Sequence, residues 1–445
     1  MRAGSARTQV SMAADAASVE VAQPPIPRDS PLAPFANEVY EEEDHSLAGA
    51  VPSTAVIEAL VAEHGSPLFI MSTDAAWGQY QALQAALPRA KLHYAVKSLP
   101  QIDLCRALAE RGAMFDLATT GEVEMMKELG VDPSRTIHTH PIKRKKDVEA
   151  ALEYGCTTFV VDNFNEIEKM AAFKEDAEVM LRLSFRSMEA TIDLSYKFGA
   201  QPHEAMGMLR ALRESGVPTR GLCFHTGSNA ALPTKSVEAI RVCRQLFDMA
   251  AAEGIALRTL DIGGGFPVPD VGAVLPIDTY CEPVVEALDE LFPNTEILAE
   301  PGRFVAAPAM TLVTSVMGKS TRSGMHWYYL DDGLYGSFSS QVFDHRTDTI
   351  IPLKALRAAE RGETTLQSYL VGSGAGIDAR HAIESFPSVL AGPTCDSFDT
   401  IREGVLLPDL NVGDLLVSPM MGAYTLASAS DFNFFYKTKV VQWSP

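Results

Sequence analysis

From about residue 53 onwards, short apolar runs alternate with stretches whose apolar residues recur at helical spacing. The apolar runs occupy residues 92–96, 114–118, 136–139, 158–161, 179–183, 221–225, 259–262 and 296–299. Helical spacing is found at 101–111, 121–129, 146–154, 165–174, 202–215 and 234–253. This repeated strand–helix order predicts an α/β fold with a parallel sheet. Eight units over roughly 210 residues fit a closed (β/α)8 barrel, whereas an open doubly wound sheet would be shorter.

Beyond about residue 303 the pattern changes to short alternating runs that are typical of β structure. They lie at residues 310–316, 327–330, 367–369, 415–417 and 437–442, with turn residues between them. We expect a second, mainly β domain here, completed by an N-terminal strand within residues 55–70. The predicted organisation is a barrel over residues 71–304 and a β domain over 305–445, which an N-terminal segment at 46–70 joins.

Residues 1–45 are rich in Ala, Ser and Pro and lack both periodicities. Residues 1–50 also hold three basic and eight acidic residues, which favours a disordered acidic tail. The first fourteen residues, with two Arg and no acid, faintly resemble an organelle transit peptide. A loose tail is the favoured interpretation.

The formal net charge of the whole chain is −20, which argues against nucleic acid or an anionic membrane as a partner. The chain contains no run of 18 apolar residues, which a membrane-spanning helix would need. Its six cysteines are scattered without a CxxC pair. This favours reduced thiols in a cytoplasmic enzyme over a disulfide framework, and it gives no sign of a metal site.

Polar residues stand at the carboxyl ends of several predicted barrel strands, which is where barrel enzymes carry their active sites. They include Lys97, Asp116, Arg182, His225 and Glu300. We therefore expect these side chains to meet in one pocket. Lys97 is the candidate nucleophile, because lost solvation and neighbouring cations would lower the pKa of its amine and free it for Schiff-base chemistry. Taken alone, a surface lysine at a strand end would be the commoner interpretation.

A run of three glycines, Gly263, Gly264 and Gly265, follows the seventh predicted strand. Such a run exposes backbone N–H groups, and barrels often bind phosphate in the loops after strands seven and eight. Arg303 could clamp the same phosphate, and Glu300 would then need a cation such as a protonated pyridine nitrogen. The alternatives are a flexible turn and a Glu–Arg ion pair at a domain junction.

His225 and Ser228 stand at the end of the sixth predicted strand. A neutral imidazole can stack on a flat cofactor and a serine can bond a phosphate oxygen, although a lone histidine is as often structural. A lysine, a glycine phosphate loop, a pyridine-facing glutamate and a stacking histidine together suggest pyridoxal 5′-phosphate as the cofactor.

The chain resembles the barrel-fold pyridoxal-phosphate decarboxylases of basic amino acids, above all the eukaryotic-type ornithine decarboxylases. The matching stretches run in family order over about residues 55–440, and their joint occurrence is far more specific than any one of them. They are YAVKS at 94–98, FDLATTGE at 115–122, HTGS at 225–228, DIGGGFP at 261–267, EPGRF at 300–304, YGSFSS at 335–340, FDH at 343–345, GPTCDSFD at 392–399 and GAYTLASASDFN at 422–433.

The resemblance implies a role for each matching residue. Lys97 would carry the cofactor, Glu300 would pair with its ring nitrogen, and His225 would stack on its ring. The phosphate would be held by Gly263, Gly264, Gly265, Ser228, Arg303 and Tyr424. Asp116 and Arg182 would support Lys97 and the ring from the barrel wall.

The resemblance also implies a homodimer with active sites at the subunit interface. Cys395 of the partner subunit would protonate the α-carbon after CO2 leaves. Asp344 from one chain and Asp396 from the other would bind the distal ammonium of a diamino acid, whose desolvation buried anions would offset. Lys197 and Asp399 resemble a subunit-bridging ion pair. The alternatives are solvated loops for the two substrate aspartates and an inert buried thiol for Cys395.

The expected activity is decarboxylation of a small basic amino acid, with L-ornithine to putrescine as the first choice and L-lysine as the second. Leu99, Phe343 and Arg346 depart from the family pattern, and Arg346 would repel a long cationic substrate or bind a second carboxylate. Another diamino acid therefore stays open. Racemisation on the same barrel and an inactive regulatory homologue are the further alternatives, which the Cys395–Asp396 pair and the presence of Lys97 respectively argue against.

Overall fold

The computed structural model of the chain describes residues 51–186, 190–192, 196–268, 275–364, 366 and 384–444. The predicted tail at 1–45 and the predicted strand at 367–369 lie outside the described residues. Within the described ranges, no helix is both long and apolar enough to cross a membrane.

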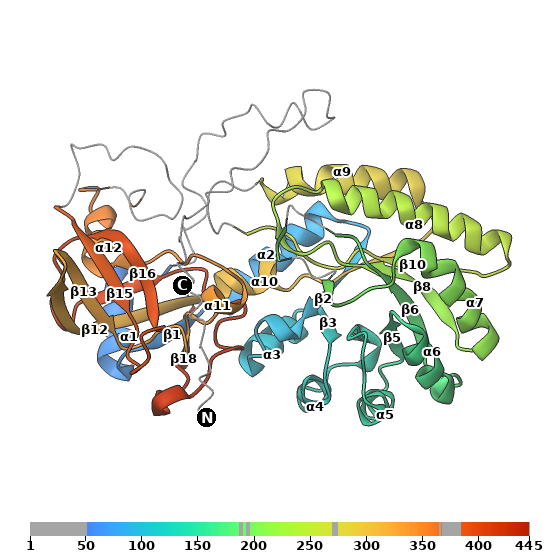
Figure 1. Ribbon diagram of the computed structural model, residues 1–445, viewed down its shortest axis with the longest axis horizontal. Helices are drawn as coiled ribbons and strands as arrows, with labels where there is room; N and C mark the ends of the chain where they lie inside the picture. The colour runs from blue at the N-terminus through green and yellow to red at the C-terminus, as the bar shows by residue number, and fades with distance from the viewer. Residues whose placement is uncertain are drawn as a thin grey trace, which may run out of the picture. The chain divides into compact units, whose positions relative to one another are not determined.

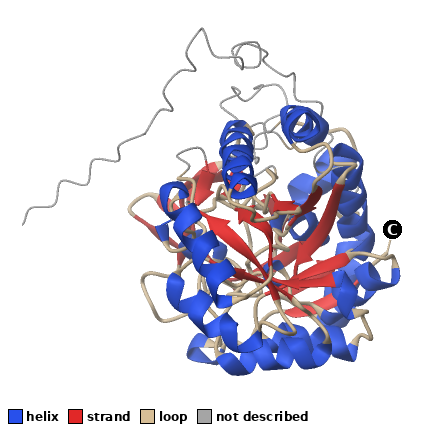
Figure 2. Cartoon of the chain, turned by 90° about the vertical axis from the view of Figure 1, so that its right-hand side faces the viewer, coloured by secondary structure: helices blue, strands red, loops and turns tan. Residues whose placement is uncertain are grey.

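Eight strands pair in parallel and close into a barrel, and each of them coincides with a run predicted from the sequence. They are β2 (Ala90–Ala95), β3 (Met114–Leu117), β4 (Thr136–His138), β5 (Thr158–Val161), β6 (Glu178–Leu183), β8 (Thr219–Phe224), β10 (Thr259–Asp261) and β11 (Glu296–Ala299). Figure 2 shows these red strands enclosed by blue helices. Because the strands are covered on both faces, their residues are almost continuously buried, which explains apolar runs without alternation.

The barrel helices lie outside the strands (Figure 1). They are α2 (Thr73–Ala86), α3 (Ile102–Glu110), α4 (Thr120–Glu128), α5 (Lys145–Tyr154), α6 (Phe164–Met170), α7 (Ala205–Ser215), α8 (Thr234–Ala252), α9 (Ile277–Leu291) and α10 (Arg303–Ala306). Short 3-10 turns add η1 (Val96–Ser98), η2 (Pro133–Arg135), η3 (Ala171–Phe173), η5 (Pro202–Glu204), η6 (Ala307–Ala309) and η8 (Phe432–Phe434). The sequence analysis did not predict α2 or α9.

A second sheet follows the barrel, as expected. Its main path runs in the order β14 (Ile351–Pro352), β17 (Leu415–Ser418), β12 (Met310–Arg322), β13 (Met325–Leu330), β15 (Phe386–Ala391) and β16 (Thr400–Leu407). The N-terminal strand β1 (Leu68–Met71) pairs antiparallel with β12 and parallel with β18 (Lys439–Gln442). It completes the sheet, as the sequence predicts. Helices α11 (Ser340–Phe343) and α12 (Leu353–Glu360) and a two-stranded antiparallel sheet of β7 (Ala190–Ile192) with β9 (Ser228–Ala230) complete the described elements.

Most of the segment predicted to hold the N-terminal strand is helical instead, as α1 (Thr54–His64). The side chain of Ser53 caps this helix by accepting a hydrogen bond from the Val56 N–H at 3.4 Å. At the other end Gly65, with φ +80°, terminates it, and its N–H bonds the carbonyl of Val61. The strand is therefore confined to the four residues after this stop.

The second sheet returns its chain to the barrel mouth. The backbone leaves β11, passes through α10 and η6, and enters β12, so the barrel-to-sheet junction begins at the end of the eighth barrel strand. Later, the Tyr424 N–H bonds the carbonyl of Ser98 at 2.9 Å, which attaches the loop after β17 to the end of β2. Residues from both parts of the fold therefore meet at one end of the barrel.

Two buried histidines in the barrel strands make stability depend on pH. Burial is the main cause that lowers the pKa of His93 and of His138 to about 4, from an ordinary 6.5. Asp116 partly opposes the shift at both, while Lys143 and His140 reinforce it at His138. Neither ring nitrogen of His138 has a hydrogen-bond partner among the described residues.

We predict that His138→Gln reduces acid sensitivity. Between pH 6.5 and 4 the unfolded chain protonates this histidine while the folded chain does not, so the wild type loses stability as the pH falls. Urea denaturation near pH 7 and near pH 4 should show the variant gaining about 3 kcal/mol relative to the wild type. The buried carboxyls act in the opposite sense but are common to both chains. A difference between the chains that does not change with pH would contradict this prediction.

Candidate active site

A cavity of about 280 Å³ opens at the carboxyl ends of the barrel strands, where the sequence predicts the site. Eight of the predicted residues line it: Lys97, Arg182, His225, Ser228, Gly265, Glu300, Arg303 and Tyr424. Asp116 is buried behind the wall, against Lys97. These residues follow five different barrel strands and the loop after β17, so closure of the barrel is what brings them together.

Lys97 lies in η1 at the end of β2, with Nζ 3.2 Å from Oδ2 of Asp116 in β3. Burial opposes the charge on Lys97, but Asp116 and Glu300 outweigh it, so the pKa of the ammonium is raised. The expectation of a lowered pKa is therefore wrong, because carboxylates rather than cations dominate the surroundings of Lys97. The candidate nucleophile is held as an ammonium ion.

Thr139, which the sequence analysis missed, fixes this ion pair from its other side. Its hydroxyl donates to Oδ1 of Asp116 at 2.5 Å, while Lys97 takes Oδ2. Thr139 directly follows β4, so the strand-end rule could have found it. Phe198 and His140 form a further part of the wall, in edge contact with ring centroids 5.7 Å apart. No spacing or chemistry in the sequence singled out Phe198.

Glu300 and Asp261 are two carboxyls buried beneath the cavity. Burial, with Asp261 and Asp116 adding to it, raises the pKa of Glu300 well above its ordinary value. Burial also raises the pKa of Asp261 to about 6, although its Oδ1 accepts the Gly263 N–H at 2.8 Å. A carboxyl in this position is strongly stabilised by a nearby cationic N–H, which a protonated pyridine ring supplies. The sequence analysis did not single out Asp261.

His225 is neutral. Burial first, and then Arg182 and Lys97, hold its pKa well below the ordinary range. Its Nδ1 accepts the Gly227 N–H at 3.1 Å, which leaves the proton on Nε2. A flat, uncharged ring therefore faces the cavity, as stacking on an aromatic cofactor requires.

The glycine loop approaches neighbouring strand ends too closely for any side chain. A Cβ on Gly264 would lie 2.4 Å from the carbonyl oxygen of Glu300, and one on Gly265 would lie 2.2 Å from that of Gly227. Gly265 also has φ +99°, which L-residues with side chains rarely adopt. The loop therefore presents bare backbone beside the cavity, which is the arrangement that suits a phosphate.

Arg303 lies at the start of α10 and connects several predicted site residues. Its Nε lies 3.3 Å from Oγ of Ser228, and its Nη2 lies 2.5 Å from Oδ2 of Asp344. The guanidinium also stacks over the ring of Tyr424, 5.0 Å from the centroid. Its Nη1 is buried and has no hydrogen-bond partner among the described residues.

Cys395 and Asp396 are not brought to this cavity. They lie in the loop between β15 and β16, and Cys395 is exposed whereas the other five cysteines are buried. Oδ2 of Asp396 accepts the hydroxyl of Tyr335 at 2.5 Å, and the Cys395 N–H donates to Oδ1 of Asn433 at 3.1 Å. Within one chain, the two residues are therefore held on the surface of the β domain.

Asp399, Lys197 and Arg346 each have a partner within the chain. Asp399 is buried and accepts the backbone N–H groups of Leu334 at 2.7 Å and Thr394 at 3.1 Å, so within the chain it anchors its own loop. Lys197 lies 4.8 Å from the centroid of the Phe198 ring, and its ion pair with Asp399 of another subunit stays a prediction. Arg346 does not line the cavity, because it is buried against Asp348 at 3.5 Å.

Comparison with known proteins decides what this cavity belongs to. The family described as "Pyridoxal-dependent decarboxylase, pyridoxal binding domain" matches residues 76–307. The chain belongs to this family. The decarboxylase is 37% identical over 381 residues to the lysine/ornithine decarboxylase of Selenomonas ruminantium, which covers 85% of this chain and 90% of that protein. It is 34% identical to the ornithine decarboxylase of Neurospora crassa, over 82% of this chain and 78% of that protein.

The fold agrees with solved structures of such enzymes. The crystal structure of lysine/ornithine decarboxylase complexed with putrescine from Vibrio vulnificus is 46% identical to this chain, with a TM-score of 0.78. The match covers 88% of this chain and 98% of that one. The sequence-based assignment to the barrel-fold decarboxylases is thereby confirmed, as is the barrel with an added β domain.

The residues of the decarboxylase fit pyridoxal 5′-phosphate. The unpaired Nη1 of Arg303 and the bare glycine backbone suit its phosphate, and the buried Glu300 suits its ring nitrogen. The neutral ring of His225 suits its flat face.

We predict that Gly265→Ala weakens cofactor binding. The new Cβ would force the loop away from the carbonyl of Gly227 at a cost of about 1–3 kcal/mol, which is roughly fivefold or more in the cofactor dissociation constant. An absorbance titration with pyridoxal 5′-phosphate measures the effect. Gly254→Ala is the matched control, because Gly254 also has a positive φ, +74°, but has nothing within 4 Å of its Cβ position. Equal affinity in both variants would contradict the assignment of the loop.

Proposed function

We propose that this decarboxylase converts L-ornithine to putrescine and CO2, with L-lysine as a second substrate, and thus serves polyamine biosynthesis. The observation that carries the choice is Asp344, a carboxylate that forms an ion pair with Arg303, which lines the cofactor cavity. A diamino acid needs such an anion for its distal ammonium. The proposal is further supported by the names of the relatives, which include lysine/ornithine decarboxylases crystallised with putrescine and with cadaverine.

In this proposal each side chain has a defined task. Lys97 would hold the cofactor through its amine, which Asp116, fixed by Thr139, keeps directed into the cavity. Glu300 holds the proton on the ring nitrogen, and His225 covers the ring without adding charge. When bound, the cofactor ring takes up the electron pair that remains on the α-carbon as CO2 departs.

We further propose that two chains share each site. Cys395, the proposed proton donor to the α-carbon, and Asp396, the proposed second ammonium ligand, lie outside the cavity of their own chain. They reach a cavity only if the loop between β15 and β16 docks on a second copy. A homodimer related by a two-fold axis would place each loop in the opposite site.

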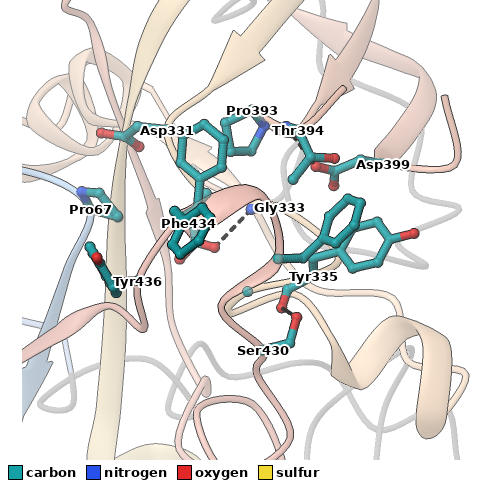
Figure 3. A pocket seen from close by; sticks show the side chains of 14 residues that line it. Pro67, Asp331, Gly333, Tyr335, Pro393, Thr394, Asp399, Ser430, Phe434 and Tyr436 are labelled. Carbon is teal, nitrogen blue, oxygen red and sulfur yellow. Dashed lines mark hydrogen bonds between the residues drawn. The ribbon is translucent and has the colours of Figure 1, made fainter. Parts of the chain in front are cut away.

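The surface around this loop supports that arrangement. Phe434 is 83% exposed and Tyr436 is 77% exposed, and Phe398 in the loop between β15 and β16 is 58% exposed. Figure 3 shows Tyr335, Phe434 and Tyr436 around an adjoining hollow of about 260 Å³. Aromatic side chains gathered on a surface are typical of a protein–protein interface. An interface that covers them would also carry Cys395 and Asp396 into it.

The remaining alternatives are weaker. An inactive regulatory role has a precedent, because the chain is 34% identical to antizyme inhibitor 2 of Xenopus laevis. However, Lys97, Glu300 and Arg303 are all present here and all line the cavity. Racemisation is not favoured, since the relatives compared above and the solved structures named here are decarboxylases.

We predict a substrate profile set by Asp344. In a CO2-release assay over ornithine, lysine, arginine, diaminopimelate and 2,4-diaminobutyrate, ornithine should be turned over best and lysine next. Asp344→Ala should raise the KM for ornithine by about tenfold or more, because a buried ammonium loses its charged partner. Lys97→Ala should abolish turnover. Turnover of diaminopimelate with ornithine inert would overturn the substrate assignment.

We predict that two inactive variants complement each other. Lys97→Ala and Cys395→Ala are each expected to be poorly active, but a mixed dimer regains one site that has both wild-type residues. Random exchange of subunits then restores about a quarter of wild-type activity. Phe434→Ser with Tyr436→Ser should yield monomers on analytical ultracentrifugation and lose the same activity. If mixing restores nothing while the mixed dimer is shown to form, the sites are not shared.

A further inference from the structure

Arg303 is a partner for two anions, Asp344 and the cofactor phosphate, and its N–H donors are divided between different groups. Nη2 is bonded to Asp344 and Nε to Ser228, whereas the buried Nη1 has no partner among the described residues. The side chain of Arg303 is only 5% exposed and that of Asp344 is 13% exposed, so water screens their attraction weakly. Nη1 is therefore the donor left for a phosphate oxygen, on the same guanidinium that holds Asp344.

We propose that Arg303 couples the two halves of the site: it neutralises Asp344 until the cofactor phosphate binds, and then shares its charge so that Asp344 can accept the distal ammonium of the substrate. This inference rests on the proposed function. It adds that the carboxylate of Asp344 becomes available to the substrate only when the cofactor has bound.

The sign of the coupling follows from the charges. Asp344 and a phosphate compete for one cation, so each weakens the hold of Arg303 on the other. A phosphate on Nη1 therefore leaves Asp344 less neutralised and more attractive to an ammonium. By linkage, binding of an ammonium at Asp344 must strengthen phosphate binding by the same factor. The site would thus favour a diamino acid only after the cofactor has been loaded.

No other described cation contacts Asp344. Its ion pair is with Arg303, whereas Lys97 pairs with Asp116, and Arg346, two residues further along the chain, is held by Asp348. The ring of Tyr424 lies against the guanidinium and prevents it from turning freely between two partners. Coupling therefore occurs by sharing of one fixed guanidinium and does not require a large movement.

Asp344→Asn tests the coupling, because the amide oxygen can still accept from Nη2 while the competing charge is removed. We expect the variant to bind pyridoxal 5′-phosphate at least about fivefold more tightly than the wild type. Pyridoxal, which lacks the phosphate, should bind both chains equally. Asp396→Asn is the matched control, since it removes the charge of the other aspartate proposed to bind the substrate. Asp396 accepts from Tyr335 and does not contact Arg303. It should leave the affinity for both compounds unchanged.

The reciprocal effect can be measured without the cofactor. In calorimetric titrations, saturating inorganic phosphate should increase the affinity of the wild-type chain for putrescine by at least about fivefold. The same phosphate should have a smaller effect in Asp344→Asn, where only the direct attraction between phosphate and putrescine remains. Asp344→Ser serves as a second variant if the thermal unfolding of Asp344→Asn shows a damaged fold.

The results separate this inference from the proposed function. A wild-type chain that binds no pyridoxal 5′-phosphate would overturn the proposed function itself. A wild type that binds and turns over ornithine, with Asp344→Asn binding the cofactor equally or more weakly, would overturn only the coupling. An equal tightening of pyridoxal and of its phosphate would also overturn it, because the effect would then not act through the phosphate.

Discussion

The active site depends on the balance of charges that are brought out of water at the barrel mouth. Asp116 and Glu300 are buried there, and both attract the ammonium of Lys97. A buried carboxylate without a cation is costly, so a cation beside these groups stabilises the closed barrel. The raised pKa values of Glu300 and Asp261 show that this matching is incomplete in the chain alone. A cationic ring nitrogen would complete it.

The barrel was predictable because its physics is local. Each strand is buried on both faces and reads as a continuous apolar run, and the polar residue that follows marks the functional end. The β domain was less predictable, since β13 and β15 pair in parallel although Leu330 and Phe386 are far apart in sequence. β16 is partly exposed and contains Gly404, so it carries no clear apolar pattern. Likewise Thr139 lies in no motif and Asp261 was assigned no role, yet each positions a motif residue.

Some predictions about the site were wrong because they depend on distances between residues on separate strands. A lysine at a strand end is a candidate nucleophile, but the direction of its pKa shift is set by which groups closure of the barrel places beside it. Here Asp116 on β3 and Glu300 after β11 raise the pKa of Lys97. Arg346 shows the same limit, since only the fold reveals that Asp348 already neutralises it. Cys395 shows another, because it lies on the surface of its own chain and its role rests on the proposed second copy.

These points explain how Lys97, an ammonium with a raised pKa, fits the proposed role of nucleophile. Lys97 is charged because Asp116 and Glu300 need a cation, so its proton is held by demand from its neighbours rather than by any property of the amine. When another cation lies beside Glu300, Glu300 stabilises the charge on Lys97 less, and the pKa of Lys97 must fall. The same logic governs Arg303, whose charge is committed to Asp344 until a second anion arrives. In both cases, binding of the cofactor redistributes charges that the folded chain already holds.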